Sequence, residues 1–401
     1  MRPYNCPLPP LRSRFLRLHA LPGPLHASTR SFAQVAHRPV LDVPSEDDKP
    51  FMVPIADASF ETYHFDPPPY SRRELVKIKL MRAQTDGTRR RWVVQGKKDS
   101  WILPLVDGQE AVAVGIEHAL TKEDKRITAY RSHGNTLMRG ATIRSIIGEL
   151  LGRSDGIAHG KGGSMHMYAK SFFGGNGIVG SSVPLGTGIA LAQQYDNTGN
   201  ITVNLYGDGA ANQGQVHEAF NMAKLWSLPV MFGCENNKFG MGTSVERASA
   251  STEYYKRGQY ISGLKVDGMD VLAVLAAVRH GREWIKAGNG PLIYEYETYR
   301  YSGHSMSDPG TAYRSREELQ DERSNDPITS LKSKLIDWHI MTEDEAKAEE
   351  KEIRGLVSRE IQAAEQMPEP EPRWDVLFED IYVSGSEPAQ RRGRSIDETI
   401  Y

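Results

Sequence analysis

Acidic and amide side chains at two points near the middle of the chain could hold a magnesium ion beside a phosphate group. Asp208 lies in a Gly-Asp-Gly motif, and Asn237 ends an Asn-Asn pair. Mg²⁺ prefers about six hard oxygen ligands and usually shares them between a protein and a phosphate. Asp208 offers a charged oxygen, Asn237 a side-chain carbonyl and Phe239 a backbone carbonyl. These residues predict a site for a magnesium ion and a diphosphate.

The segments around both motifs have the pattern that such a site requires. Residues 201–206 and 229–234 are apolar runs typical of buried strands, and residues 214–226 between them are typical of a helix. Each motif therefore follows the carboxyl end of a parallel strand, where open α/β sheets bind ligands. The flanking glycines let the backbone approach a ligand closely. We expect the helix after Gly209 to direct its free N–H groups at the diphosphate.

Either motif alone would be weak, because a Gly-Asp-Gly is usually a turn and an Asn-Asn pair usually a loop. Their placement at two strand ends, one crossover apart, favours the ligand site over these structural readings.

Alternation of strands and helices extends along much of the chain and predicts an α/β fold with a doubly wound, mostly parallel sheet. A Ser-x-x-Glu pattern predicts a helix that starts near Ser71. The other expected elements are helices at 109–120, 271–286 and 342–366 and strands at 126–130 and 291–298.

A second glycine-rich motif allows three readings. Residues 175–180 match Gly-x-Gly-x-x-Gly, which suggests a nicotinamide oxidoreductase. That motif should follow a strand, but here it follows a polar, aromatic loop, and Asp196 downstream ends a helix rather than a strand. The second reading is a tight loop without ligand. The third, which we favour, is a backbone segment that contacts a flat cofactor ring.

Composition excludes several classes of protein. The net charge is -2, which gives no sign of a nucleic-acid or membrane-surface partner. The two cysteines, Cys6 and Cys234, supply neither a disulfide framework nor a cysteine metal cage. The apolar stretch at 271–278 is too short to span a bilayer.

The N-terminus differs from the rest of the chain. Residues 1–41 contain six arginines and no acidic residue, which is typical of a mitochondrial transit peptide, although a basic tail is the alternative. We divide the chain into a transit peptide, an extended N-terminal segment, a diphosphate-binding domain and a helical C-terminal region with a tail that contacts partner subunits. The corresponding residues are 1–32, 33–70, 71–330 and 331–401.

Seven segments together resemble the alpha subunits of mitochondrial pyruvate dehydrogenases, in the thiamine-diphosphate-dependent 2-oxo-acid dehydrogenase family. The similarity covers roughly residues 107–383. The segments are YRSHG (130–134), HGKGGSMHM (159–167), GGNGIVG (174–180), YGDGAANQGQ (206–215), ENNKFGMGTSVERASAST (235–252), KVDGMD (265–270) and YRYSGHSMSDPG (299–310).

The resemblance implies a role for individual residues. Tyr130, Arg131, Gly209 and Ala210 are expected at the diphosphate, and the backbones of Gly177 and Val179 at the aminopyrimidine ring. Asp208, Asn237 and Phe239 would hold Mg²⁺, and His304 would lie in a loop that closes over the cofactor and serve catalysis. Ser305 and Ser244 match phosphorylated positions. Without the resemblance, His304 and both serines would read as solvated loop residues.

The resemblance also implies a function and partners. The expected reaction is thiamine-diphosphate-dependent decarboxylation of pyruvate and transfer of the acetyl group to a lipoyl arm, in the mitochondrial matrix. The chain would act in a heterotetramer of two alpha and two beta subunits, with a lipoyl-bearing acetyltransferase, a regulatory kinase and a phosphatase as further partners. The beta subunit would supply the glutamate that protonates the cofactor, so this chain alone would not turn over.

One segment departs from the family pattern. Residues 78–105 lack the usual sequence, and Pro104 stands where the family has an active-site histidine. A shifted reading frame in the gene model would explain this, because codons for residues 101–105 read one base later can encode the family's Gly-Phe-Cys-His. The alternatives are a catalytically weak paralogue or a non-catalytic scaffold.

Overall fold

The computed structural model describes residues 107–305 and 308–373, five short strands outside them, and residues 376, 380–382 and 386. The chain divides into two compact units, residues 1–36 and 37–401, and the first lies outside the described residues. The predicted transit peptide, the 78–105 segment and Pro104 also lie outside them. No described helix is long and apolar enough to cross a membrane.

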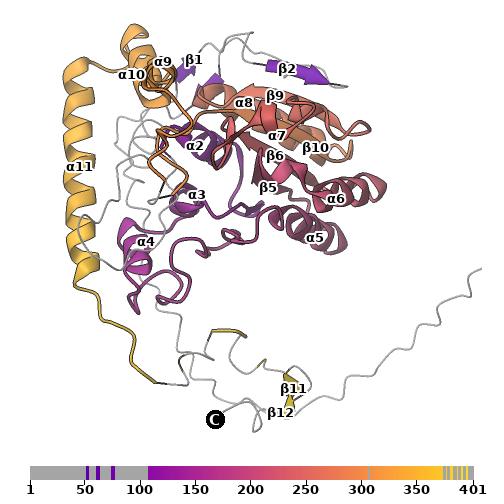
Figure 1. The fold of residues 1–401 in the computed structure, drawn as a ribbon, viewed down its shortest axis with the longest axis horizontal. Coiled ribbons are helices and arrows are strands. Elements are labelled where there is room, and N and C mark those ends of the chain that lie inside the picture. Colours follow the sequence, from indigo (N-terminus) through magenta and orange to yellow (C-terminus); the bar gives the residue numbers. More distant parts are fainter. Residues whose placement is uncertain are drawn as a thin grey trace, which may run out of the picture. The chain divides into compact units, whose positions relative to one another are not determined.

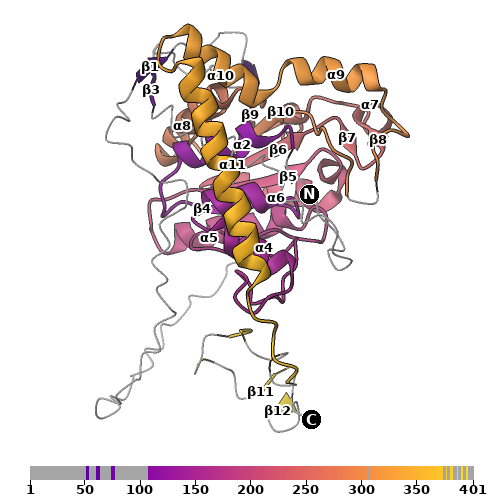
Figure 2. The ribbon, with the colours of Figure 1, turned by 90° about the vertical axis from the view of Figure 1, so that its left-hand side faces the viewer.

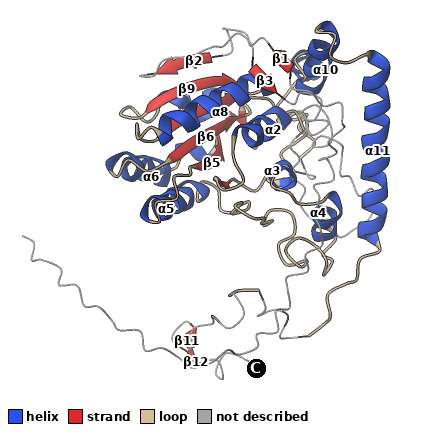
Figure 3. Ribbon diagram, turned by 180° about the vertical axis from the view of Figure 1, so that it is seen from behind, coloured by secondary structure: helices blue, strands red, loops and turns tan. Residues whose placement is uncertain are grey.

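A six-stranded sheet forms the centre of the second unit (Figures 1 and 3). Its order is β2-β9-β10-β6-β5-β4, and every neighbouring pair is parallel except the edge pair of β2 and β9. The strands are β2 (Phe60–Tyr63), β9 (Ser262–Asp267), β10 (Leu292–Glu297), β6 (Val230–Asn236), β5 (Thr202–Gly207) and β4 (Lys125–Ile127). The predicted α/β class with a mostly parallel sheet is confirmed.

Helices cover both faces of this sheet. Helices α2 (Glu110–Ala119) and α8 (Val271–Lys286) pack together on one face, and α5 (Ser182–Tyr195) and α6 (Gly214–Leu225) pack together on the other. Both faces are apolar because successive residues of the central strands are apolar and point to opposite sides. Met231, for example, contacts the α2–α8 face, whereas Val230 and Phe232 contact the α5–α6 face.

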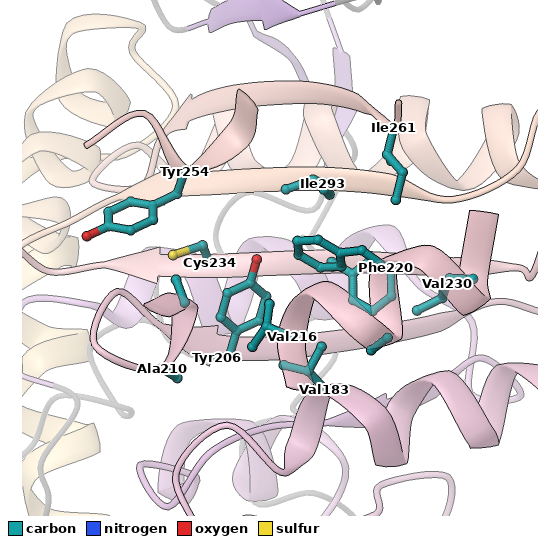
Figure 4. Packing of buried hydrophobic residues seen from close by; sticks show 14 of the residues in the cluster. Val183, Tyr206, Ala210, Val216, Phe220, Val230, Cys234, Tyr254, Ile261 and Ile293 are labelled. Atoms are coloured by element: carbon teal, nitrogen blue, oxygen red, sulfur yellow. The ribbon is translucent and has the colours of Figure 1, made fainter. Parts of the chain in front are cut away.

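The core on the α5–α6 face lies just behind the ends of β5 and β6. Figure 4 shows Val183, Val216 and Phe220 of the helices pointing toward strand side chains such as Tyr206 and Cys234. All five are buried. Dense packing of this kind gives the loops at the strand ends a rigid base.

Helices outside the sheet layers complete the unit. Helix α11 (Glu343–Glu365) packs against α4 (Ile143–Leu150), as Figure 2 shows, and α10 (Pro327–Asp337) contacts α2. The other elements are β1 (Phe51–Val53), β3 (Glu74–Val76), α3 (His133–Met138), η2 (Ala210–Asn212), β7 (Phe239–Gly240), β8 (Thr243–Ser244), α7 (Val245–Ala248), η3 (Tyr254–Lys256), α9 (Arg316–Ser324), β11 (Gln390–Arg391) and β12 (Arg394–Ser395).

Most expected elements are confirmed to within a few residues, and α8 has the predicted bounds. One is wrong. Residues 74–76 do not continue a helix from Ser71 but form β3, which pairs antiparallel with β1. A capping pattern of two residues is a weak local preference, and here pairing with a distant strand satisfies the backbone instead.

Candidate active site

The two motifs meet at the carboxyl edge of the sheet. Strand β5 ends at Gly207 and is paired in parallel with β6, whose last residue is Asn236. Asp208 and Asn237 therefore leave neighbouring strands at the same edge. A Cβ atom on Gly240 would lie 3.2 Å from the Gly209 Cα and 3.7 Å from Asp208 Oδ2. The loop after β5 and the loop after β6 are thus in contact, and a Cβ atom at Gly240 would fit only tightly between them.

Asp208 is a buried carboxylate with little charge compensation. Its residue is 3% exposed, and burial raises its pKa to about 6, although backbone amides and the more distant Arg300 oppose the shift. No ion pair of Asp208 occurs in the described part of the chain. An unpaired buried carboxylate is costly, so a cation beside it would be strongly favoured. The residues present fit a divalent metal ion.

The ligand set around Asp208 is incomplete by itself. Among the described residues no group of three His, Cys, Asp or Glu side chains could hold a metal. Among the residues that the structure describes, Asn237 Oδ1 is engaged only by a long contact of 3.4 Å from the Phe239 amide, and the Phe239 carbonyl accepts a hydrogen bond from Arg300 Nη1 at 3.2 Å. One carboxylate and two carbonyls leave room for phosphate oxygens, as Mg²⁺ sites commonly do.

The segment after Gly209 has the predicted helix and, before it, a short turn. Helix α6 begins at Gly214, as predicted, and the 3₁₀ turn η2 lies between Gly209 and this helix. The N–H groups next to Asp208 are therefore those of a tight turn. Their role at a diphosphate stays a prediction.

Arg131 and His304 are in contact with each other. Arg131 Nη2 donates to the His304 carbonyl at 3.3 Å. The rings of Tyr130 and His304 pack edge to face, with their centroids 5.6 Å apart. Burial lowers the pKa of Arg131 to about 10, so its guanidinium stays charged. Burial, Arg131 and Arg300 lower the pKa of His304 to about 4, so its imidazole is neutral near pH 7.

Gly177 and Val179 lie in a loop that reaches the same region. The Val179 carbonyl accepts a hydrogen bond of 2.7 Å from Gln213 Nε2, and the Gln213 amide bonds to the Ala210 carbonyl within η2. The loop is thereby tied to the segment that follows Asp208. Ile178 and Val179 are 72% and 44% exposed, so the outer side of the loop is uncovered in the single chain.

The two serines are placed next to the site. Ser305 follows His304, and its carbonyl accepts from the Asp308 amide. Ser244 pairs with Phe239 across the β7–β8 hairpin, which directly follows Asn237. Both are partly buried. Their modification stays a prediction.

Comparison with known proteins places these observations in a family. A model described as "Dehydrogenase E1 component" matches residues 78–373. Three similar proteins are mitochondrial pyruvate dehydrogenase E1 component alpha subunits. The one from Chaetomium thermophilum is 54% identical and covers 97% of this chain and 99% of its own length. Those from Saccharomyces cerevisiae and Homo sapiens are 52% and 50% identical, covering 86% and 80% of this chain and 84% and 80% of their own lengths.

The chain belongs to the dehydrogenase E1 component family.

Membership in the dehydrogenase E1 family confirms the predicted family, the dependence on thiamine diphosphate and the assignment as an enzyme component of the oxidoreductase class. The mitochondrial names of the relatives confirm the predicted mitochondrial matrix localisation. The matched range begins at residue 78 and so includes the segment that departs from the family pattern.

The nicotinamide reading of residues 175–180 is not supported. These residues follow a loop in which Phe172 makes two isolated bridges, one to Ala169 and a parallel one to Arg126 of β4, but no strand in the described part of the chain leads into them. A dinucleotide motif requires that strand. Asp196 is the C-cap of α5, as the sequence indicated.

Two residues of this E1 site escaped the sequence reasoning. Arg300 is 1% exposed and bonds to the carbonyls of Phe239 and Met241, which joins the loop after β10 to the loop after β6. Gln109 is 3% exposed and accepts a hydrogen bond from Asn237. Arg300 lies in the segment 299–310 that carries the family resemblance, so the sequence could have drawn attention to it. Nothing in the sequence marked Gln109 as a neighbour of Asn237.

Proposed function

We propose that this chain is the alpha subunit of the pyruvate-decarboxylating component of a pyruvate dehydrogenase complex. With a beta subunit it would carry out oxidative decarboxylation of pyruvate and reductive acetylation of a lipoyl group. The names of the relatives support the substrate. The observation that carries the proposal is the buried, unpaired Asp208 beside Asn237 at neighbouring strand ends.

In this proposal Asp208, Asn237 and the Phe239 carbonyl hold Mg²⁺, which joins the diphosphate of the cofactor to the protein. Gly209 and Ala210 present backbone N–H groups to the diphosphate. The Arg131 guanidinium supplies a charge-assisted donor. Thiamine diphosphate supplies the carbanion chemistry, and the protein orients it and excludes water.

His304 has the properties expected of a residue that touches the reacting molecules. It is neutral near pH 7, and its Nδ1 is buried without a hydrogen-bond partner in the described structure. A neutral imidazole can donate from one nitrogen and accept at the other. We assign His304 to proton handling or to orientation of the substrate, in a loop held over the site by Arg131.

A second subunit is part of the proposal because the single chain leaves the site open on one side. Besides Ile178 and Val179, large apolar side chains are exposed on α5 and α6, which pack together. They are Leu185, Leu191, Tyr195, Met222 and Leu225. Exposed apolar groups gathered in this way favour a protein partner, and we assign the beta subunit to it.

The remaining parts of the proposal concern the assembly and its control. They are the stoichiometry of two alpha and two beta subunits, a lipoyl-bearing acetyltransferase as the acceptor, and a kinase and a phosphatase that act on Ser305 and Ser244. A phosphate adds about 1.5 to 2 negative charges. Beside His304 this charge would repel the diphosphate and open the loop.

The test is co-expression with a beta subunit, followed by pyruvate-dependent release of carbon dioxide and by melting curves with and without Mg²⁺ and thiamine diphosphate. The wild-type assembly should be active and should melt at a higher temperature with both ligands. Asp208→Ala should lose both properties, because it removes the charged metal ligand. An inactive wild type, or a ligand-induced shift unchanged in Asp208→Ala, would count against the proposal.

A further inference from the structure

We infer that Gln109 is a positioning residue for the metal site: its side chain holds the Asn237 amide with Oδ1 turned toward the cation. This inference rests on the proposed function, because it concerns the same magnesium and diphosphate site. It adds a residue that the metal ligands themselves do not include.

The contact that carries the inference is buried on both sides. Asn237 Nδ2 donates to Gln109 Oε1 at 3.1 Å, and the two residues are 8% and 3% exposed. An amide that donates from its nitrogen has its oxygen on the opposite side. There Asn237 Oδ1 also receives the long contact from the Phe239 amide, which favours the same orientation. The oxygen is thus left with capacity for a cation.

The Gln109 side chain has no other evident structural role. It occupies the N-cap of α2, yet it makes no side-chain cap bond there. Its Nε2 is buried without an acceptor in the described part of the chain. The Asn237 amide is therefore the described hydrogen-bond partner of this buried side chain, through Oε1.

The backbone that carries Gln109 is pinned on the side of the closing loop. Thr298 Oγ1 donates to the Gly108 carbonyl at 3.3 Å, and the Tyr301 amide donates to the Asp107 carbonyl at 3.0 Å. Gly108 has φ +93°, and a Cβ there would lie 2.2 Å from the Tyr299 carbonyl oxygen. Only glycine permits this approach. The backbone next to Gln109 is therefore held by the loop after β10, and its side chain bonds to Asn237 in the loop after β6.

Loss of such an outer-sphere partner typically costs about 10- to 100-fold in metal affinity. The test uses the chain assembled with its beta subunit. Thermal stabilisation is titrated with Mg²⁺ at saturating thiamine diphosphate, which gives the Mg²⁺ concentration for half-maximal effect. Gln109→Met should raise this concentration about 10- to 100-fold, and Gln109→Leu, which removes the same bond with another shape, should do so too.

The matched control is Gln193→Met. Gln193 is equally buried, at 4%, and bonds to Ile201 and Thr202 at the opposite end of β5. This substitution should lower the melting temperature without moving the Mg²⁺ requirement. A double-mutant cycle gives the second readout. In an Asn237→Ala background, Gln109→Met should change the Mg²⁺ requirement no further, because its effect runs through Asn237.

The outcomes separate the inference from the proposed function. If the wild type shows no stabilisation by Mg²⁺ and thiamine diphosphate, both are overturned. If the wild type responds and Gln109→Met responds equally, the inference alone is wrong. The same holds if only one of Gln109→Met and Gln109→Leu weakens the response, since packing would then be responsible. The inference alone is also wrong if Gln109→Met raises the Mg²⁺ requirement in the Asn237→Ala background as much as in the wild type.

Discussion

Asp208 is a buried carboxylate whose charge should cost the folded chain stability. It forms no ion pair with the described residues, and burial raises its pKa to about 6 from an ordinary 3.8. Above pH 6 the folded protein must therefore hold a charge that the unfolded chain exposes to water. This arrangement makes sense where a cation later neutralises the charge.

Asp208→Asn should consequently stabilise the ligand-free protein at pH 8, by about 3 kcal/mol. The sign follows from the raised pKa: the penalty is absent well below pH 3.8, where the carboxyl is protonated in both states, grows as the pH rises from about 4 to 6, and is complete above 6. Chemical unfolding of both proteins without Mg²⁺ or cofactor, from pH 5 to 8, measures it. A gain that is constant with pH, or no gain at pH 8, would show that the carboxylate is not destabilising.

At this scale the sequence predicted that the two motifs meet at one sheet edge, but it did not predict the contacts that support them. Asp208 and Asn237 could be predicted because each follows an apolar strand, and the parallel alternation brings strand ends together. Gln109 could not, because its partner Asn237 is 128 residues away. Arg300 likewise could not be assigned, since its burial depends on how two loops pack.

Loops between the elements carry the site, and buried anionic groups shape them. Glu149 of α4 is fully buried, and its carboxylate accepts hydrogen bonds from the amides of Ala158, Gly160, Gly162 and Gly163 at 2.7–2.9 Å. A carboxylate at the centre of four amides holds this glycine-rich segment in one conformation. The sequence predicted a glycine-rich loop but gave no sign of what would hold it.

Glu149→Gln should destabilise the protein by about 2–3 kcal/mol, because an amide NH₂ would face two backbone donors in a buried place. Urea unfolding measures the change, and hydrogen exchange at residues 158–163 should become faster. The control is Glu360→Gln, which weakens the more exposed Arg144–Glu360 pair and should cost less than about 1 kcal/mol. Equal effects of the two substitutions would contradict this role of Glu149.

The closing loop should respond to charge at Ser305. Asp308 Oδ2 accepts from the His304 amide at 2.7 Å and from the Tyr313 hydroxyl at 2.6 Å, which holds the loop from one carboxylate. Ser305→Glu adds a like charge beside it, so turnover should fall by up to about 100- to 1,000-fold, as when a preorganised donor is lost. The melting temperature should hardly change, because the loop is not part of the core.

Steady-state decarboxylation by the co-expressed assembly tests this, with Ser305→Ala as the uncharged control. If Ser305→Glu turns over like the alanine variant, charge at this position does not control the loop.

The bounds of an element could be predicted where its apolar periodicity was long, as in α8. The prediction failed for elements of only a few residues. The turn η2 and the strand β3 each contain three residues. Three residues are too few to show a period. The structure of β3 depends on its pairing with β1, and that of η2 on a local turn hydrogen bond.

The molecule as a whole brings three loops from distant parts of the chain to one edge of the sheet. The loops after β5 and β6 touch at Gly209 and Gly240, and Arg300 connects the loop after β10 to Phe239. This follows from the strand order, in which β10, β6 and β5 are neighbours. The sequence predicted a parallel sheet, but strand order depends on crossover connections that local patterns do not specify.

The central claim is that Asp208, Asn237 and the Phe239 carbonyl hold one divalent cation at this edge. The most direct measurement is a crystal structure of the assembly grown with thiamine diphosphate and Mn²⁺ in place of Mg²⁺, with the Mn²⁺ located by its anomalous signal. We predict a single strong peak within ligand distance of Asp208 and Asn237 oxygens, next to the diphosphate. A bound cofactor whose Mn²⁺ peak lies away from Asp208 would contradict the account.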